Sequence, residues 1–329
     1  MNTFKALQIS KDGDQQLTES VQLSRDDLMP GDVLVTVEYS TINYKDGLAI
    51  TGKGPVVRKW PMIPGIDFAG TVIESDHAEF SKGDAVVLNG WGVGEAHYGA
   101  YAEEARVKGD WLIKKPEGMT AKQCMAVGTA GYTAMLSVLA LERYGITPEQ
   151  GPVLVTGASG GVGSVAVSIL AKLGYEVIAS TGRKEHADFL RQLGASEVID
   201  RAELSEKGRP MGKERWRAAV DSIGSYTLAN VIAQTQYGGA VTSCGLAQGA
   251  DLPLTVMPFI LRGVSLLGID SVMAAKEVRE QAWARVQQDL DLEKLELLSE
   301  TVGFDQIIEK ATDIVDGKIK GRVIVDIAK

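Results

Sequence analysis

The first third of the chain alternates apolar and polar residues in short runs. Segments such as "DVLVTVEYS" and "DAVVLNG" repeat with a period of two and are separated by glycine and proline turns. This is the pattern of strands with one buried face. It continues to about Cys124 and predicts a small, partly open β-barrel.

A different pattern begins at Lys122. The run "AKQCMAVGTAGYTAMLSVLALERYG" has helical spacing and ends in glycine, as a helix C-terminus often does. Apolar segments then alternate with amphipathic ones, from "GPVLVTG" and "SVAVSILAKLG" to "GAVTSCG" and "VSLLGID". We therefore expect a parallel sheet with helices on both faces.

The alternation stops near the end of the chain. A charged helix, "EVREQAWARVQQDL", is followed by a last strand, "GRVIVDIA", which we expect to return to the first domain. Since 329 residues are too many for one ordinary core, two domains are expected. The fold class is α/β: a Rossmann-type, doubly wound parallel sheet plus a β-rich domain.

Charge and composition limit the kinds of ligand and the cellular location that we expect. The net charge of -9 argues against general binding of nucleic acid or an anionic membrane, which requires a basic face. Cys124 and Cys244 lie far apart without metal or redox spacing, so a reducing, cytoplasmic location is expected. The N-terminus does not resemble a signal peptide. A charge-free run over 152–171 is interrupted by "TGASGGVGS", which favours strand, loop and helix over a membrane span.

The stretch "VLVTGASGGVGSVAVSIL" places glycines between a predicted strand and helix. Such a loop brings backbone amides and a helix N-terminus close to a pyrophosphate, which predicts a dinucleotide cofactor. The usual glycine pattern is incomplete, because Ala158 stands at its first glycine. The residues expected at the pyrophosphate are Ser159, Gly160, Gly161, Val162 and Gly163.

The same letters also fit G-x-S-x-G, the nucleophile elbow of α/β-hydrolases. That mechanism requires an acid and a later histidine after Ser159. His186 is the one histidine beyond it, and only Glu176 and Glu185 supply acids between the two. All three fall in the next strand and helix, which leaves little room for a catalytic triad.

The end of the next predicted strand indicates which dinucleotide binds. An NAD enzyme usually carries an acidic residue there to hold the ribose diol. This chain has Ser180 and Thr181 instead, followed by Arg183 and Lys184, which favours the 2′-phosphate of NADPH. The alternative is a solvated helix start that happens to be basic. Arg201 is expected either to stack on the adenine or to be a surface charge.

The order of "INYKD", "PGIDFAG", "GTAGYTA" and "GRVIVDI" resembles the medium-chain dehydrogenase/reductase superfamily over the whole chain. The longer stretches "NYKDGLAITGKG", "WPMIPGIDFAGTV" and "MPFILRGVSLLGIDSVM" are similar to its NADPH-dependent acryloyl-CoA reductases, in the zinc-free, quinone-oxidoreductase-like branch. The resemblance implies a GroES-like catalytic domain from residues 1–124 and 300–329. It also implies an NADP-binding Rossmann domain from 125–299 and a homodimer joined through the nucleotide-domain sheets.

The resemblance also bears on metal binding. At the places where zinc-dependent relatives carry ligands, this chain has Tyr44, Ile66 and the segment around Cys124. One thiol without histidine or carboxylate partners does not make a zinc site. Asp67, beside Ile66, is expected to be a structural hydrogen-bonding residue. We therefore expect no metal.

Without a metal, the expected chemistry is hydride delivery to the β-carbon of an activated C=C, which leaves enolate charge on the carbonyl oxygen. Tyr44 is the candidate donor to that oxygen or to the α-carbon, and Asn43 and Asp46 are expected to brace its loop. The alternative is that Tyr44 only packs against the nicotinamide. The resemblance implies further cofactor contacts from Ser180, Thr181, Gly182, Arg183, Leu246, Ile260, Ser271 and Lys318.

The expected reaction is the reduction of acryloyl-CoA to propanoyl-CoA with NADPH. Lys53, Arg58 and Lys59 form a basic patch that suits CoA phosphates, or a loop kept soluble by its charges. The closest alternative is a zinc-free NADPH:quinone oxidoreductase. A second alternative is a non-catalytic, crystallin-like NADPH-binding protein. The sequence leaves open the substrate range, the oligomer size and the stereochemistry of hydride transfer.

Overall fold

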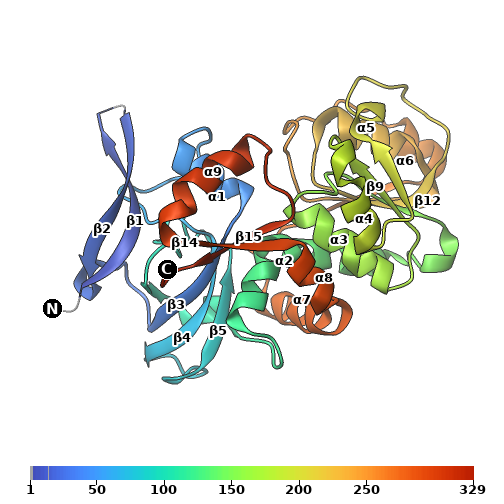
Figure 1. Ribbon diagram of the computed structural model, residues 1–329. Helices are drawn as coiled ribbons and strands as arrows, with labels where there is room; N and C mark the ends of the chain where they lie inside the picture. Colours follow the sequence, from blue (N-terminus) through green and yellow to red (C-terminus); the bar gives the residue numbers. More distant parts are fainter. Residues whose placement is uncertain (1–2, 14) are drawn as a thin grey trace. The chain divides into compact units, whose positions relative to one another are not determined.

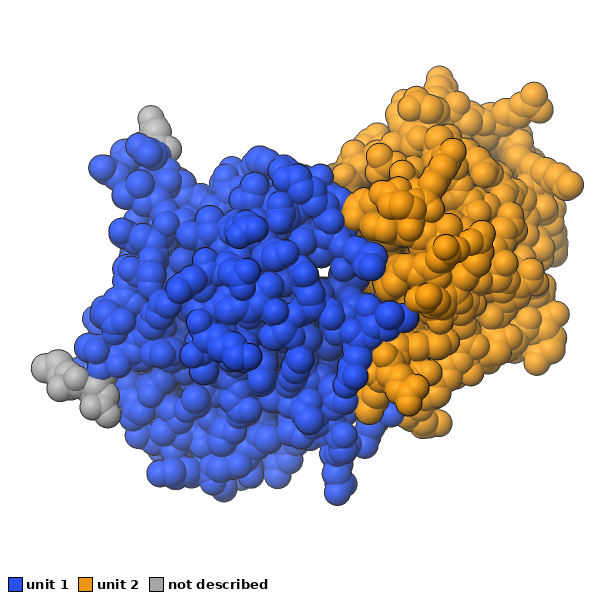
Figure 2. All heavy atoms as spheres, viewed as in Figure 1, with its two compact units in different colours: residues 1–129, 271–287, 295–329 blue, residues 130–270, 288–294 orange. Residues whose placement is uncertain are grey.

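The computed structural model describes residues 3–13 and 15–329. The chain divides into two compact units, coloured separately in Figure 2. Unit 1 contains residues 1–129, 271–287 and 295–329, and unit 2 contains residues 130–270 and 288–294. Each unit has its own sheet, so each is described separately.

Unit 1 is built on a seven-stranded mixed sheet with the order β14-β15-β3-β4-β5-β7, in which β6 pairs with β3. Its strands are β3 (Val33–Ile42), β4 (Asp67–Ser75), β5 (Ala85–Asn89), β6 (Glu104–Val107), β7 (Leu112–Lys114), β14 (Ser299–Gly303) and β15 (Arg322–Asp326). A separate antiparallel pair is formed by β1 (Thr3–Asp12) and β2 (Gln15–Ser24). The last strand, β15, pairs antiparallel with β3, so the expected return of the chain end to the first part is confirmed.

The helices of unit 1 include α1 (Tyr44–Thr51) and α9 (Ile307–Val315), which lie side by side in Figure 1. Their close approach depends on Gly47, because a Cβ there would come within 2.7 Å of the side chains of Ile314 and Val315. Two further helices, α7 (Lys276–Asp289) and α8 (Leu292–Leu297), precede β14 in the sequence. The end of α7 and the start of α8 fall in the segment 288–294, which belongs to unit 2. We had expected Tyr44 to lie in a loop, and that prediction was wrong, because Tyr44 begins α1.

The segment 271–287 belongs to unit 1, although we had expected all of 125–299 to be in the nucleotide-binding part. Two of its side chains account for the difference. Arg279 Nη1 donates to the carbonyl oxygen of Asn89 at 2.6 Å, and Trp283 Nε1 donates to Asn89 Oδ1 at 3.1 Å. The assignment of catalytic and nucleotide roles to the two parts stays a prediction.

Helix α2 (Ala121–Tyr144) crosses from residues of unit 1 into residues of unit 2. It matches the expected helix, apart from Gly128, whose φ of 52° interrupts the helical conformation. By length and composition α2 is apolar enough to cross a membrane, but 89% of its most apolar window is buried. This is typical of a core helix.

Unit 2 is a six-stranded sheet with the order β10-β9-β8-β11-β12-β13, and all of its strand pairs are parallel. Its strands are β8 (Val153–Val155), β9 (Val177–Thr181), β10 (Glu197–Asp200), β11 (Trp216–Asp221), β12 (Thr235–Ser243) and β13 (Ser265–Gly268). The helices are α3 (Gly161–Lys172), α4 (Ala187–Leu193), α5 (Ser225–Ala233) and α6 (Met257–Arg262). This is the Rossmann strand order, which confirms the expected doubly wound sheet.

Candidate functional site

In unit 2, the glycine loop joins β8 to α3 next to β11, where the strand order reverses. Ligands of open α/β sheets bind at this point. Gly157 has a φ of 58°, and a Cβ on Gly163 would come within 2.3 Å of the Gly157 carbonyl oxygen. The tight turn is thus made by Gly157, one residue before the buried Ala158, and the loop needs no glycine at 158.

Ser159 connects the glycine loop to the end of β9. Its Oγ lies 2.9 Å from Thr181 Oγ1, and the Thr181 hydroxyl oxygen also accepts from the amide of Arg183 at 3.2 Å. In a nucleophile elbow the serine would instead contact an imidazole. The geometry therefore supports a phosphate-binding loop rather than a hydrolase site.

Arg201 lies directly against the turn after β9. A Cβ on Gly182 would come within 2.3 Å of Arg201 Nε, so the guanidinium covers that glycine. Lys184 is turned to Asp200, with Nζ 3.4 Å from Oδ2. The end of β9 thus has Arg183 and Arg201 close to the turn, whereas Lys184, which we had expected to join Arg183 at a 2′-phosphate, is paired with Asp200.

Asp221, at the end of β11, was missed by the sequence analysis. It accepts from Thr156 Oγ1 at 2.7 Å and from the Gly224 amide at 2.8 Å, and burial raises the pKa of its carboxyl. These bonds fix the ends of β8 and β11 beside the glycine loop. The feature of the sequence that could have indicated Asp221 is a single aspartate at the end of an apolar strand.

In unit 1, Tyr44 is the first residue of α1, and its side chain is 40% exposed. Within the described part of the chain, no hydrogen bond is recorded for its hydroxyl. The start of α1 is held by Asn43 and Asp46: the Asn43 amide donates to Asp46 Oδ2 at 2.8 Å, and the Ile66 amide donates to Asp46 Oδ1 at 3.0 Å. The expected bracing by Asn43 and Asp46 is confirmed, but it caps a helix rather than a loop.

Asp67 is fully buried and accepts three hydrogen bonds, as expected of a structural residue. The donors are Thr41 Oγ1 at 2.8 Å, Asn43 Nδ2 at 3.0 Å and the Thr129 amide at 2.7 Å. These contacts tie the end of β3, the start of α1 and the bend in α2 to the first residue of β4.

Arg322 was also missed by the sequence analysis. It starts β15 and is 2% exposed. Its guanidinium donates to Thr41 Oγ1 at 3.0 Å, Asn43 Oδ1 at 3.3 Å and the Ala126 carbonyl at 3.1 Å. Gly128 makes room for it, because a Cβ there would come within 2.5 Å of Arg322 Nη2. We refer to Thr41, Asn43, Asp46, Asp67 and Arg322 as the buried network.

Burial, charge and hydrogen bonding have opposing effects on the pKa values of Asp46 and Arg322 in the buried network. Burial and the charge of Asp67 raise the pKa of Asp46 to about 7, although its hydrogen bonds from Asn43 lower it. Burial lowers the pKa of Arg322, while both carboxylates favour its charged form. A carboxyl that titrates near neutrality thus lies two residues from Tyr44.

The other residues that were predicted to contact the cofactor are exposed or bonded to other residues of the chain. Leu246 and Ile260 are 58% and 72% exposed, which is incompatible with the core positions that their apolar character alone suggests. Ser271 belongs to unit 1, where its carbonyl oxygen accepts from Arg279 at 3.4 Å. The ammonium of Lys318 lies 3.2 Å from both Asp313 and Asp316.

The basic patch expected for CoA phosphates is partly neutralised. Lys53 pairs with Asp316 at 3.2 Å, and Arg58 lies 4.0 Å from Glu95.

Residue types do not fit a zinc site. Among residues 3–13 and 15–329, no group of three or more His, Cys, Asp or Glu side chains is placed to hold a metal ion. Burial raises the pKa of both the Cys124 and the Cys244 thiol to about 12, which disfavours the thiolate that zinc requires.

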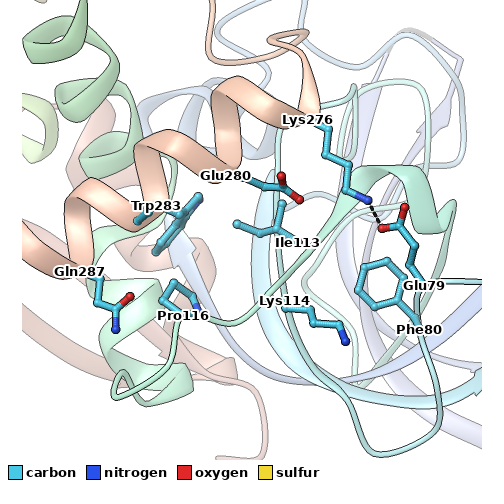
Figure 3. Close-up of a pocket in the computed structure, with 10 residues that line it drawn as sticks. Glu79, Phe80, Ile113, Lys114, Pro116, Lys276, Glu280, Trp283 and Gln287 are labelled. Atoms are coloured by element: carbon cyan, nitrogen blue, oxygen red, sulfur yellow. Dashed lines mark hydrogen bonds and ion pairs between the residues drawn. The ribbon is translucent and has the colours of Figure 1, made fainter.

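A cavity of about 510 Å³ in unit 1 contains none of the predicted site residues. Figure 3 shows Phe80, Ile113 and Trp283 at its apolar wall and an ion pair between Lys276 and Glu79 at its edge. We assign this cavity no part in the chemistry.

Two protein families match segments of this chain. Residues 29–117 match the family described as "Alcohol dehydrogenase GroES-like domain", and residues 161–288 match "Zinc-binding dehydrogenase". The chain is 53% identical to "Acrylyl-CoA reductase AcuI" of Ruegeria pomeroyi, over 98% of this chain and 99% of that one.

Two solved structures are also similar. One is the yhdH oxidoreductase from Salmonella enterica in complex with NADP, with 48% identity, a TM-score of 0.96, and coverage of 98% of this chain and 99% of that one. The other is Bacillus subtilis protein yhfP with NAD bound, with 46% identity, a TM-score of 0.95, and coverage of 99% and 100%. The chain belongs to the medium-chain dehydrogenase/reductase family of oxidoreductases, in its quinone-oxidoreductase-like branch.

Proposed function

We propose that this protein reduces the activated C=C of acryloyl-CoA to propanoyl-CoA with NADPH. The observation that carries the proposal is the 53% identity to an acrylyl-CoA reductase along 98% of the chain. The site supports it, because a fixed and partly exposed phenol lies in a region whose residues do not fit a metal.

NADPH, when bound, supplies the hydride that is delivered to the β-carbon. Ser159 to Gly163 would hold the pyrophosphate through backbone amides at the start of α3. Arg183 and Arg201 would bind the 2′-phosphate at the end of β9, where Ser180 and Thr181 leave space and avoid the repulsion that an acidic side chain would cause.

Tyr44 acts on the substrate. Hydride addition at the β-carbon moves negative charge to the thioester oxygen, and the Tyr44 O–H donates a hydrogen bond to that oxygen as the enolate forms. A proton from water then adds at the α-carbon and gives propanoyl-CoA. The buried network keeps the phenol in place by fixing the first turn of α1. Burial of the network also keeps water away from the groups that hold this turn.

A homodimer is part of the proposal. Strand β13 is at the edge of the six-stranded sheet. The helix that precedes it in the sequence, α6, exposes Ile260 and Leu261 by 72% and 56%, and the N-cap residue of α6, Val256, is 66% exposed. An unpaired edge beside an apolar helix face favours pairing with a second copy of the chain. The two free cysteines agree with a reducing, cytoplasmic location.

Loss of the absorbance of NADPH, measured with acryloyl-CoA and separately with a simple quinone, tests the function. We expect turnover of the thioester with a much higher kcat/KM than that of the quinone. The second candidate, a quinone reductase, is favoured by 47% identity to "Putative quinone oxidoreductase YhfP" of Bacillus subtilis over 98% of the chain. Turnover of the quinone without turnover of the thioester would establish that candidate instead.

A further inference from the structure

Arg322 is a cation held inside unit 1 by partners that are far away in the sequence. Moving a guanidinium out of water costs several kcal/mol unless hydrogen bonds and opposite charges compensate. Here Thr41, Asn43 and the Ala126 carbonyl accept its hydrogen bonds, and Asp67 and Asp46 favour its charge. The last strand of the chain therefore holds the end of β3 and the residue just before Tyr44.

Asp46 connects the same network to the first turn of α1. Its two oxygens accept the amides of Asn43 and Ile66, so the ionised carboxylate fastens the helix start to the segment before β4. A protonated carboxyl is a poorer acceptor for these two amides, because the charge that strengthens both bonds is gone. Proton uptake by Asp46 thus weakens the cap next to Tyr44.

Charged and titratable groups approach Asp46 from several elements. Asp67 on β4 disfavours its ionisation, whereas Lys45 on α1 favours it. Arg322 on β15 and Tyr101, from the segment before β6, are electrostatically coupled to it as well, and burial keeps the pKa of Tyr101 well above 10. Of these four neighbours, Arg322 is a cation that is itself buried, so its removal leaves the two carboxylates without their buried counter-charge.

We propose that Arg322 and Asp46 form a titratable positioning device for Tyr44: Arg322 holds Asn43 from the last strand, and protonation of Asp46 loosens the first turn of α1. Arg322 and Asp46 are positioning residues that act through the backbone of α1. The inference rests on the proposed role of Tyr44, since it concerns how that hydroxyl is held.

The first test is the pH dependence of kcat with saturating acryloyl-CoA and NADPH. The pKa of about 7 for Asp46 predicts that kcat falls as the pH drops through about 7. Asp46→Asn is expected to give a low kcat without this dependence. Arg322→Gln removes the cation, so the fall in kcat should move to higher pH by about one pH unit. Arg322→Lys keeps a charge and is expected to restore part of the wild-type profile.

NADPH affinity, from fluorescence titration, should stay within about twofold in all three variants, because binding in unit 2 does not use the network. A purely structural role for Arg322 would lower kcat at every pH without moving the profile. The inference is therefore contradicted if kcat of Arg322→Gln falls at the same pH as kcat of the wild-type enzyme. A wild-type enzyme that does not turn over acryloyl-CoA at any pH contradicts the proposed function instead.

A second measurement does not depend on activity or on the folding of Arg322 variants. Amide hydrogen exchange of Asn43 and Ile66 in the wild-type protein, corrected for the intrinsic effect of pH, should be less protected at pH 6 than at pH 8. Asp46→Asn should show equal protection at both pH values. Equal protection in the wild-type protein would overturn the inference even if the enzyme is active.

Discussion

Tyr44 is the side chain on which the proposed chemistry depends most. It begins α1 and is partly exposed, while the residues that fix its backbone are buried. The phenol therefore combines a fixed position with access to a ligand. The sequence predicted Asn43 and Asp46 as its supports, because amides and carboxylates beside a turn usually bind backbone. Asp67 was expected from the family resemblance to be a structural hydrogen-bonding residue.

Tyr44→Phe removes the hydroxyl and keeps the ring. If the hydroxyl stabilises the enolate, kcat should fall by about 100-fold, the usual effect of losing one such donor. NADPH affinity should change by less than about threefold, because the ring is retained. Steady-state kinetics and fluorescence titration measure the two quantities. Unchanged turnover would leave Tyr44 a packing residue.

Arg183 and Lys184 are adjacent cations with different surroundings. Lys184 is paired with Asp200. Arg183 lies in the turn beside Gly182, which Arg201 covers. Arg183→Ala should raise the Kd for NADPH by roughly 10- to 100-fold, which corresponds to the loss of one charged hydrogen bond. Lys184→Ala is the matched control and should change the Kd little. NADH binding should be insensitive to both, and equal effects of both substitutions on NADPH would contradict the site.

Arg322 could not be predicted. It opens an apolar strand, where an exposed basic residue is the ordinary expectation. Its hydrogen-bond partners Asn43 and Thr41 are 279 and 281 residues away. Nothing local in "GRVIVDIA" indicates that these residues meet.

Helix α1 was not predicted from the local sequence pattern. Its eight residues are too few for a clear apolar period, so glycine and polar residues suggested a loop. The capping signals were nevertheless present: Asn43 precedes the helix, Asp46 is at its third position, and Gly52 follows its end with a φ of 67°. The helix is stabilised by these caps and by packing of Gly47 against α9.

Gly128 lies inside helix α2, and Gly145 directly follows its end. Both glycines have positive φ, at 52° and 96°, but of the two only Gly128 has neighbouring atoms within 4 Å of an added Cβ. Gly145→Ala should cost about 1 kcal/mol of unfolding free energy from backbone strain alone. Gly128→Ala should cost roughly 3 kcal/mol or more and lower kcat, because it displaces Arg322. Denaturant unfolding measures both, and equal losses would contradict the described packing.

The fold class, a parallel Rossmann-type sheet plus a separate β-rich part, was predicted correctly. Alternating strands and helices specified the parallel sheet of unit 2, because buried strands and amphipathic helices differ strongly in pattern. The return of β15 to the first part was also confirmed. The position of residues 271–287 was not foreseen, because it depends on Arg279 and Trp283 bonding to Asn89 far away in the sequence.

Assembly is tested with a charge on the apolar face of α6. Leu261→Lys places an ammonium on that face, which should shift the protein from dimer to monomer in sedimentation experiments. Leu297→Lys is the control, since Leu297 is also half-exposed but belongs to unit 1. A monomeric wild-type protein, or a Leu261→Lys protein that stays dimeric, would contradict the proposed interface.

The proposed reaction transfers a hydride from NADPH to the β-carbon of acryloyl-CoA. NADPH that carries deuterium at the transferred position of C4, followed by analysis of the thioester product, tests this transfer. The expected product is propanoyl-CoA with one deuterium at the β-carbon. Absence of propanoyl-CoA, or deuterium at the α-carbon, would contradict it.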